Sequence, residues 1–141
     1  ENLDGIFWEA NAKTFKFNYV SSQVERITGF SQKEWLETAN FWQNHIHPDD
    51  RARIDASIHV AIEGDADSWS DEYRFCRADG SYAAILDRGH IIRRGSGTAV
   101  RMIGAMLDLT ERQRTRAVLA MNEERLRLAT EAAEQLQIFQ I

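Results

Sequence analysis

Hydrophobic and polar residues alternate with a spacing of two near the start of the chain, a pattern that is typical of β-strands. An apolar run at 6–10 and the alternation at 15–19 predict two short antiparallel strands. We expect Phe15, Phe17 and Tyr19 to share one face of the second strand, because alternate residues of a strand point to the same side.

The same spacing returns later in the chain and predicts three longer strands. The first begins at Trp69 and ends before Asp79-Gly80, a dipeptide that predicts a two-residue hairpin turn. The second covers 82–93, where Gly89 predicts a bend or a bulge, and the third covers 100–109.

Signals for short helices fill the segment between the two sets of strands. Ser22 followed by Glu25, and Ser31 followed by Glu34, match the capping box that starts a helix. Gly29 is placed to end the first of these helices in a left-handed conformation. We therefore expect brief helical pieces that wrap around the sheet rather than a helix bundle.

A longer helix is expected to begin at Pro48, which suits the first turn of a helix. Its apolar stripe consists of Ile54, Ile58 and Ile62, four residues apart, so one narrow side should lie on a flat surface. Strands and helices together predict an α+β fold: a five-stranded antiparallel sheet with a helical cap on one face.

One long helix is predicted to follow the last strand, beginning at a third capping box formed by Thr110 and Gln113. The chain thus divides into an α/β domain at 1–109 and a C-terminal linker helix at 110–141, and we leave open whether this helix leads into a second domain. Steps of three and four, the heptad pattern of a coiled coil, separate Leu119, Asn122, Leu126, Ala129, Ala133 and Leu136.

This heptad seam predicts a homodimer through the C-terminal helix. A polar helix with one thin apolar stripe needs a partner to cover it, and the same helix from a second copy is the simplest one. Asn122 at a core position is expected to fix the register and to favour two strands.

Composition narrows the class of protein. With 43% hydrophobic and 28% charged residues among 141, the chain has the make-up of an ordinary globular protein. A net charge of −5 with scattered arginines argues against a nucleic-acid partner. No apolar run approaches the ~20 residues of a membrane span, so we expect no membrane contact from this segment.

The single cysteine, Cys76, excludes an internal disulfide and fits a cytoplasmic location. The chain starts at Glu1 without a methionine, so we expect a longer parent protein, whose membrane anchor, if it has one, lies outside this segment.

Several short stretches, in a fixed order along the chain, carry a resemblance to a known family. They are Tyr19-Val20-Ser21 with Ile27-Thr28-Gly29-Phe30-Ser31; Phe41-Trp42 with Ile46-His47-Pro48-Asp49-Asp50-Arg51; Glu72-Tyr73-Arg74-Phe75 with Ala78-Asp79-Gly80-Ser81; and Gly104 with Asp108-Leu109-Thr110-Glu111-Arg112. Together they resemble a PAS domain with its PAC segment, as found in bacterial sensory proteins.

The resemblance implies a PAS-like fold and a place in a multi-domain signalling protein. In such families the tripeptide that corresponds to Asp108-Leu109-Thr110 joins the last strand to the output helix, so Asp108 and Thr110 are the expected signal-relay residues. The stretch 123–133 resembles the lead-in to a following PAS repeat. The expected downstream partner is a histidine kinase or a GGDEF-type cyclase domain.

The cluster His45-x-His47-x-Asp49-Asp50 allows a metal interpretation, because imidazole and carboxylate groups at close spacing bind zinc. The pattern lacks the last histidine of the metallo-hydrolase motif, and no second group of ligands accompanies it. We favour a role in starting the helix and predict no metal site.

Haem and flavin are not expected either. His59 lies on the helix that carries the axial ligand in haem-binding PAS domains, but it stands one residue off the apolar stripe, about 100° round the helix. Cys76 lies on a strand, outside the Asn-Cys-Arg motif of light-sensing PAS domains. We predict no bound cofactor but leave a small ligand open, in a candidate cavity lined by Phe17, Tyr19, Ile58, Tyr73, Phe75 and Ile103.

The sequence contains no paired nucleophile and base, phosphate-binding glycine loop or pair of catalytic carboxylates, so we predict no catalytic residues. The preferred hypothesis is a sensory and dimerisation module that relays a signal through its C-terminal helix. The alternatives are a receptor that binds a small ligand or haem, and a scaffold that only dimerises.

Overall fold

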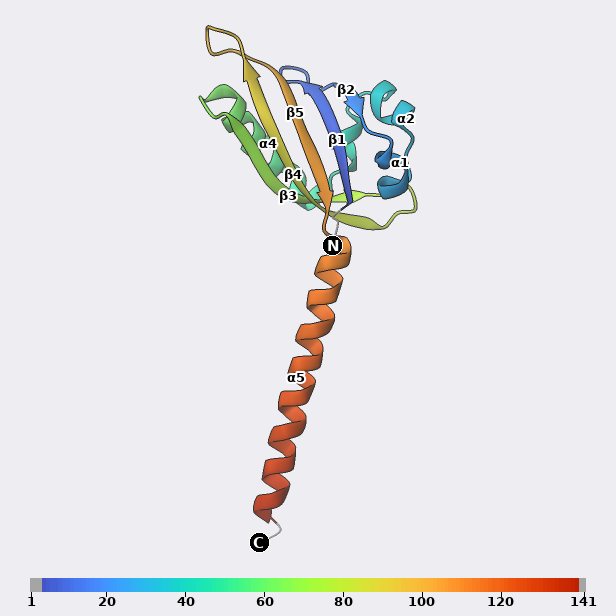
Figure 1. The fold of residues 1–141 in the computed structure, drawn as a ribbon, viewed down its shortest axis with the longest axis vertical. Helices are drawn as coiled ribbons and strands as arrows, with labels where there is room; N and C mark the ends of the chain where they lie inside the picture. The colour runs from blue at the N-terminus through green and yellow to red at the C-terminus, as the bar shows by residue number, and fades with distance from the viewer. Residues whose placement is uncertain (1–3, 140–141) are drawn as a thin grey trace. The chain divides into compact units, whose positions relative to one another are not determined.

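The computed structural model describes residues 4–139, with side chains through 137. Within these residues five strands form a single antiparallel sheet in the order β2-β1-β5-β4-β3 (Figure 1). The strands are β1 Asp4–Asn11, β2 Phe17–Val20, β3 Ser68–Cys76, β4 Tyr82–Arg93 and β5 Ala99–Asp108.

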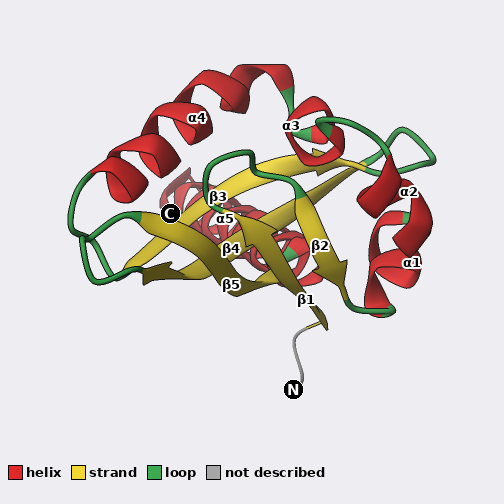
Figure 2. Cartoon of the chain, turned by 90° about the horizontal axis from the view of Figure 1, so that it is seen from above, coloured by secondary structure: helices red, strands yellow, loops and turns green. Residues whose placement is uncertain are grey.

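Four short to medium helices cover one face of this sheet (Figure 2). They are α1 Gln23–Thr28, α2 Gln32–Glu37, α3 Phe41–His45 and α4 Pro48–Glu63. The fifth helix of the described chain, α5 Thr110–Phe139, belongs to a separate compact unit, Thr110–Ile141. The first unit, Glu1–Leu109, is called the α/β unit below. The predicted α+β fold, with its capped sheet and long C-terminal helix, is confirmed.

The core lies between the sheet and α1–α4. Trp69, Tyr73 and Phe75 on β3 are buried on the inner face, as their spacing of two predicts. On α4, Ile54 and Ile58 are buried against the sheet. Other fully or nearly fully buried side chains are Ile6, Trp8, Val20, Val24, Trp35, Met102 and Met106.

Two glycines make room for the indole ring of Trp8. Gly89 and Gly104 pair directly across β4 and β5, and Gly104 also pairs with Trp8 of β1. A Cβ atom on Gly89 would lie 2.8 Å from the Trp8 ring, and one on Gly104 2.7 Å from it. The bulge expected at Gly89 is wrong, because the register shift of this pair falls between Ile92 and Arg93. Gly89 instead allows the Trp8 ring to lie close to the backbone of β4.

A register shift between β1 and β2 changes the direction of one aromatic side chain. Ala10 pairs with Phe17, while Glu9 pairs with Tyr19, so Asn18 is the extra residue of a bulge. Phe17 consequently points inward and Tyr19 points outward, where it is 49% exposed. The prediction that Phe17 and Tyr19 share a face is wrong for this reason.

Two of the predicted helix signals around α1 and α2 are confirmed. The Ser31 side chain accepts a hydrogen bond from the Glu34 backbone N–H, and Gly29 ends α1 with a positive φ of 82°. Ser22 is different: it has a helical backbone conformation and its side chain makes no capping bond, so that part of the prediction is wrong.

The turn between β3 and β4 is longer than the two residues that Asp79-Gly80 predicts. It runs from Arg77 to Ser81, with the Gly80 N–H bonded to the Arg77 carbonyl and the Arg77 N–H bonded to the Ser81 carbonyl. Gly80 has a φ of 86°, a conformation that glycine adopts without strain. Asp79-Gly80 therefore predicts the position of the turn correctly, but not its length.

We expect the substitution Gly104→Ala to destabilise the α/β unit by at least about 3 kcal/mol, since the new methyl group meets packed backbone and ring atoms. The Cβ would lie 2.0 Å from the Arg88 carbonyl oxygen. Urea denaturation followed by tryptophan fluorescence measures the change. Gly95→Ala is the matched control, because a Cβ there meets nothing within 4 Å. Equal stability of both variants would contradict the role of the glycine pair.

Candidate functional site

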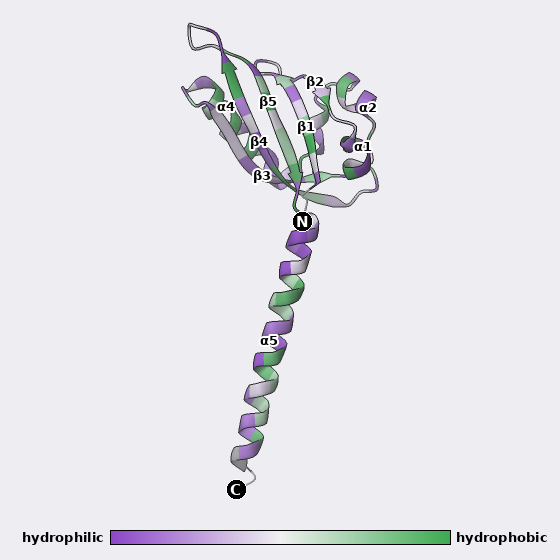
Figure 3. Ribbon diagram, viewed as in Figure 1, coloured by the Kyte–Doolittle hydropathy of each residue, from purple (hydrophilic) through white to green (hydrophobic). Residues whose placement is uncertain are grey.

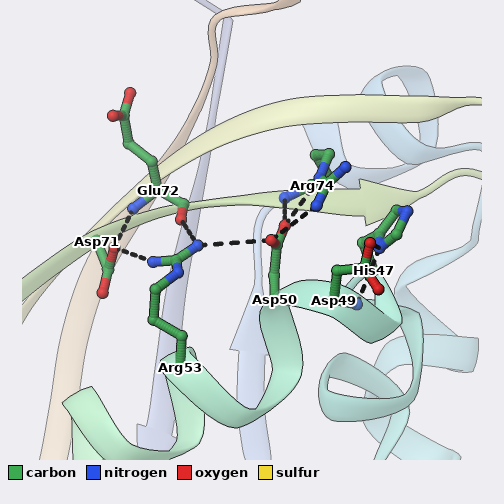
Figure 4. Close-up of polar contacts among 7 residues, drawn as sticks. All are labelled: His47, Asp49, Asp50, Arg53, Asp71, Glu72 and Arg74. Carbon is green, nitrogen blue, oxygen red and sulfur yellow. Dashed lines mark hydrogen bonds and ion pairs between the residues drawn. The ribbon is translucent and has the colours of Figure 1, made fainter.

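The start of α4 is tied to β3 by a group of charged side chains (Figure 4). Asp50 accepts hydrogen bonds from the backbone N–H of Arg74 at 2.9 Å and from its guanidinium at 2.9 and 3.1 Å. Arg53 binds the Asp71 carboxylate at 2.6 Å and the Glu72 carbonyl at 2.7 Å. These contacts fix the helix beside the outermost strand.

The bond from the Arg74 guanidinium is the largest cause that lowers the pKa of Asp50 to about 2, against the opposing effect of burial. The histidine before the helix has a capping role, since His47 Nδ1 accepts the Asp49 N–H at 3.0 Å. Pro48 is the first helical residue. The helix-start interpretation of this motif is confirmed, and among the described residues no group of three or more potential ligands is arranged to hold a metal.

A second polar group lies inside the core. The carboxyl group of Asp87, on β4, accepts the indole N–H of Trp8 at 2.9 Å through Oδ1. Its Oδ2 accepts the hydroxyl of Tyr73 at 2.8 Å. The same hydroxyl accepts the indole N–H of Trp42 at 2.8 Å. This network joins β1, β3, β4 and α3 through side chains alone.

Burial dominates the electrostatics of this network. Asp87 is 1% exposed, and its removal from water raises its pKa to about 7, although the bonds from Tyr73 and Trp8 act in the opposite direction. The pKa of Tyr73 is raised well above its usual value, first by burial and then by the charge of Asp87. Asp87 therefore changes charge close to neutral pH.

Aromatic rings surround Asp87 and leave a small cavity beside it. The cavity has a volume of about 10 Å³, which is the space for roughly one water molecule. Next to it lies a larger pocket of about 390 Å³ that opens between α3 and α4. Both share Phe15, Trp42 and Ile58 as lining residues. The inner cavity is further lined by Trp8, Ala10, Phe17, Trp69, Asp87 and Met102.

Four of the six residues that were predicted to line a cavity are buried in the core: Phe17, Ile58, Tyr73 and Phe75. The other two, Tyr19 and Ile103, are 49% and 43% exposed and lie outside it, so the prediction is wrong for them. Tyr19 is turned outward by the bulge in β2. Ile103 pairs with the outward-facing residues Glu9 and His90, and the inward positions of β5 are those of Met102 and Met106. Of the predicted residues, Phe17 and Ile58 line the inner cavity.

The two expected relay residues lie on either side of the border between strand and helix. Asp108 is the last residue of β5. Thr110 is the first residue of α5, whereas the capping-box prediction places it at the N-cap, one residue before the helix. Within the α/β unit Asp108 pairs with Arg77 at 3.3 Å, and Arg77 also donates to the Ile27 carbonyl at the end of α1. Arg77 thus connects Asp108 to the cap.

The cofactor candidates have ordinary surroundings. His59 is half-exposed, and its Nδ1 donates a hydrogen bond to the Asp55 carbonyl. Its ring lies 5.1 Å from the Phe15 ring, measured between centroids. Cys76 ends β3, is half-buried, and has its Sγ 3.6 Å from the Arg77 carbonyl. The absence of a cofactor therefore stays a prediction.

Along the second unit, α5, hydrophobic residues recur among hydrophilic ones (Figure 3). The predicted heptad residues are all exposed, with Leu119, Leu126 and Leu136 between 55% and 70%. Val118 is also exposed and lies beside the seam, whereas Met121 and Leu128 are exposed apolar residues on another side of the helix. Among the described residues, none of the helices is long and apolar enough to cross a bilayer.

Sequence reasoning missed Asp87 and its partners, although one signal was available. In the strand 82–93, Ile85 and Ile91 mark the inward positions, and Asp87 has the same parity. An aspartate among inward-facing apolar residues requires buried hydrogen-bond donors. The identity of those donors was not visible, because Trp8 is 79 residues away in the sequence.

Asp87 should make stability depend on pH. The folded chain keeps the Asp87 proton up to about pH 7, whereas the unfolded chain loses it near 3.8, so the free energy of unfolding falls as pH rises through this window. We expect a loss of roughly 3–4 kcal/mol that is absent in Asp87→Asn. Denaturant titrations between about pH 4 and pH 8 measure how the free energy of unfolding of each protein changes with pH. Parallel slopes for the two proteins would contradict the shift.

Comparison with known proteins identifies the fold. The family model described as the PAS fold matches residues 17–106. The N-terminal domain of a diguanylate cyclase with a PAS/PAC sensor from Marinobacter aquaeolei superposes with a TM-score of 0.70 at 28% identity, over 77% of this chain and 98% of that one. A sensory box histidine kinase/response regulator from Burkholderia thailandensis gives 0.69 at 31% identity, over 88% and 91%.

A sequence relative is the methyl sulfide methyltransferase-associated sensor of Methanosarcina acetivorans, 26% identical over 82% of this chain. The chain spans only 12% of that protein and 11% of an uncharacterized relative from Sinorhizobium fredii. The match to the family model covers most of the α/β unit. The chain belongs to the PAS fold family and is a sensory domain of the kind found in signalling proteins.

Proposed function

We propose that this chain is a non-catalytic sensory and dimerisation module that relays a signal from the PAS unit, residues 1–109, through α5 to an output domain. The output domain is a histidine kinase or a diguanylate cyclase. Two structural neighbours support this, since they come from proteins named as a cyclase and a histidine kinase. We place the module in the cytoplasm, which the single free cysteine supports.

The observation that carries the proposal is the exposed apolar face of α5. Leucines on a solvated helix leave apolar surface in contact with water. A partner helix that covers them stabilises the pair by about 25 cal/mol for each Å² of apolar surface that it buries. A second copy supplies an identical face in the same heptad register. Two PAS units are then held on a shared coiled coil, and a change in either unit alters the packing of both helices.

A coupling of about 1–3 kcal/mol between the PAS unit and the helix pair is enough for such a relay. Asp108 supports this role, since its pairing with Arg77 reaches the end of α1 and thereby the helical cap. A rearrangement of the cap therefore has a direct route to the last strand.

A second candidate function is that of a ligand receptor. It is favoured by the inner cavity, where a buried carboxyl group and several aromatic rings meet beside a larger pocket. The receptor and relay functions are compatible, because a ligand in the PAS unit can be the signal that α5 transmits.

Dimerisation through the seam predicts that Leu126→Glu makes the chain monomeric. Each dimer loses two buried leucines, so we expect the dissociation constant to rise at least about a hundredfold. Sedimentation velocity over a range of protein concentrations measures this change. The control is Ala120→Glu, which adds the same charge on the opposite, polar side of the exposed helix. A monomeric wild-type chain, or equal effects of both substitutions, would refute the seam.

The relay can be tested in chimeras that join α5 to the catalytic core of a histidine kinase. Linkers lengthened one residue at a time should give autophosphorylation that rises and falls with a period of seven residues, because the heptad phase sets how the output domains face each other. Activity that ignores linker length would show that α5 is a passive tether.

The same chimera tests the junction. We expect Asp108→Ala to change the basal activity several-fold, since it removes the pairing with Arg77. Asp65→Ala, at an exposed position between α4 and β3, is the control and should leave activity unchanged. If the two variants behave alike, Asp108 has no relay role.

A further inference from the structure

The pocket of about 390 Å³ between α3 and α4, called the cap pocket below, has the size of a small-molecule site, for which about 300–1,000 Å³ is typical. The inner cavity at Asp87 is different, because its volume of about 10 Å³ leaves space for roughly one water molecule. The floor of the cap pocket is apolar and consists of side chains that also belong to the buried core: Trp42, Ile46, Ile54 and Ile58. A small ligand therefore fits in the cap pocket and not in the inner cavity.

Arg51, near the start of α4, stands at the rim of the cap pocket. Its Nε donates to the Ile46 carbonyl at 2.8 Å and its Nη2 to the Asn44 carbonyl at 2.7 Å, and both of these residues line the pocket as well. The neighbouring carboxylate of Asp50 is bonded to Arg74 instead. Among the described residues no carboxylate pairs with Arg51, so the third nitrogen of its guanidinium, Nη1, is free to bind an anion.

Asp55 lies about one turn further along α4 and lines the same pocket. Residues four apart on a helix are neighbours, yet the carboxylate of Asp55 is not paired with Arg51. Its Oδ1 lies 3.4 Å from Nδ1 of His59, further along the helix. The rim thus carries a positive and a negative group that are not bonded to each other. A simple anion would be repelled by Asp55 and a simple cation by Arg51, whereas a ligand that carries both charges is attracted by both groups.

Phe15 adds an aromatic wall to the cap pocket from the turn between β1 and β2. Its ring is half-buried and lies 5.1 Å from the His59 ring, measured between centroids. Its φ of 58° is costly for a phenylalanine, and the Asn11 carbonyl fixes this conformation by accepting the Phe15 N–H at 2.9 Å. Because Trp42 lines the pocket too, an apolar group that enters meets two aromatic rings.

We propose that the cap pocket binds a free α-amino acid with a large apolar side chain. Arg51 binds the carboxylate of the ligand and Asp55 binds its ammonium group. The apolar side chain lies on the floor of the pocket, between Phe15 and Trp42. This inference rests on the receptor role proposed above and names its ligand class. The bound amino acid connects α3, α4 and the turn before β2, so it acts on the helical cap of the PAS unit.

L-phenylalanine and L-leucine are the probes, because both combine the two charges with a large apolar side chain. Two analogues of phenylalanine isolate the charges: 3-phenylpropionate lacks the ammonium group, and 2-phenylethylamine lacks the carboxylate. We expect L-phenylalanine to bind the complete chain at least about tenfold more tightly than either analogue, as isothermal titration calorimetry would measure. An analogue that binds as tightly as L-phenylalanine, or the binding of neither amino acid, would overturn the proposal.

Substitutions at the rim assign each charge to its partner. Asp55→Asn should reduce the preference for L-phenylalanine over 3-phenylpropionate at least several-fold, since only the amino acid uses this carboxylate. Arg51→Gln should in the same way reduce the preference over 2-phenylethylamine. A variant that merely loosens the fold weakens all three ligands alike, so unchanged preferences in both variants would overturn the assignment.

The location of the site is tested on one side of α4. Ala52 lines the cap pocket, so Ala52→Phe should fill it and weaken the binding of L-phenylalanine at least about tenfold. Ala56→Phe is the matched control, since Ala56 is exposed on the same helix and does not line the pocket. Thermal melting without ligand checks that both variants are folded. Equal binding by the two variants would place the ligand elsewhere and overturn the site.

The outcomes separate this inference from the functions on which it rests. If neither amino acid binds while sedimentation still shows a dimer through α5, the ligand class is wrong and the relay stands. If an analogue with a single charge binds in the cap pocket as tightly as L-phenylalanine, the receptor role stands and the amino-acid class is wrong. If the chain is monomeric yet binds L-phenylalanine with the expected preferences, this inference stands and the relay is wrong.

Discussion

The bonds to Asp87 hold the two layers of the PAS unit in one arrangement. A carboxyl group from β4 receives an indole N–H from β1 and a hydroxyl from β3, and that hydroxyl receives a further indole N–H from α3. Hydrogen bonds in the interior need correct geometry, because a buried polar group that is left unpaired destabilises the fold. Apolar packing brings the layers together, and this network fixes their relative position.

The strand pattern was predictable wherever one face of a strand is clearly more apolar than the other. On β3 the positions of Trp69, Tyr73 and Phe75 identify the inner face without ambiguity. On β5 both faces carry apolar residues, since Ile103 alternates with Met102 and Met106. A spacing of two then marks a strand but does not tell which side is buried.

Local sequence also could not locate the bulge of β2 or the polar network of the core. The bulge depends on how β1 and β2 pair, and the pairing in turn follows the packing of Phe17 and Val20 under the helices. The site around Asp87 draws residues from four separate elements. Each was recognisable as aromatic or inward-facing, but their meeting point is a property of the folded chain.

The contacts at the start of α4 also occupy the free edge of the sheet. β3 is an outermost strand, yet its Arg74 N–H binds Asp50, its Arg74 carbonyl accepts the His47 N–H, and its Glu72 carbonyl accepts Arg53. Backbone groups that already have partners cannot template a foreign strand, so the border of the sheet at Glu72 to Arg74 is protected from aggregation by β-pairing. Copies of the chain that meet along this part of β3 must do so through side-chain surfaces.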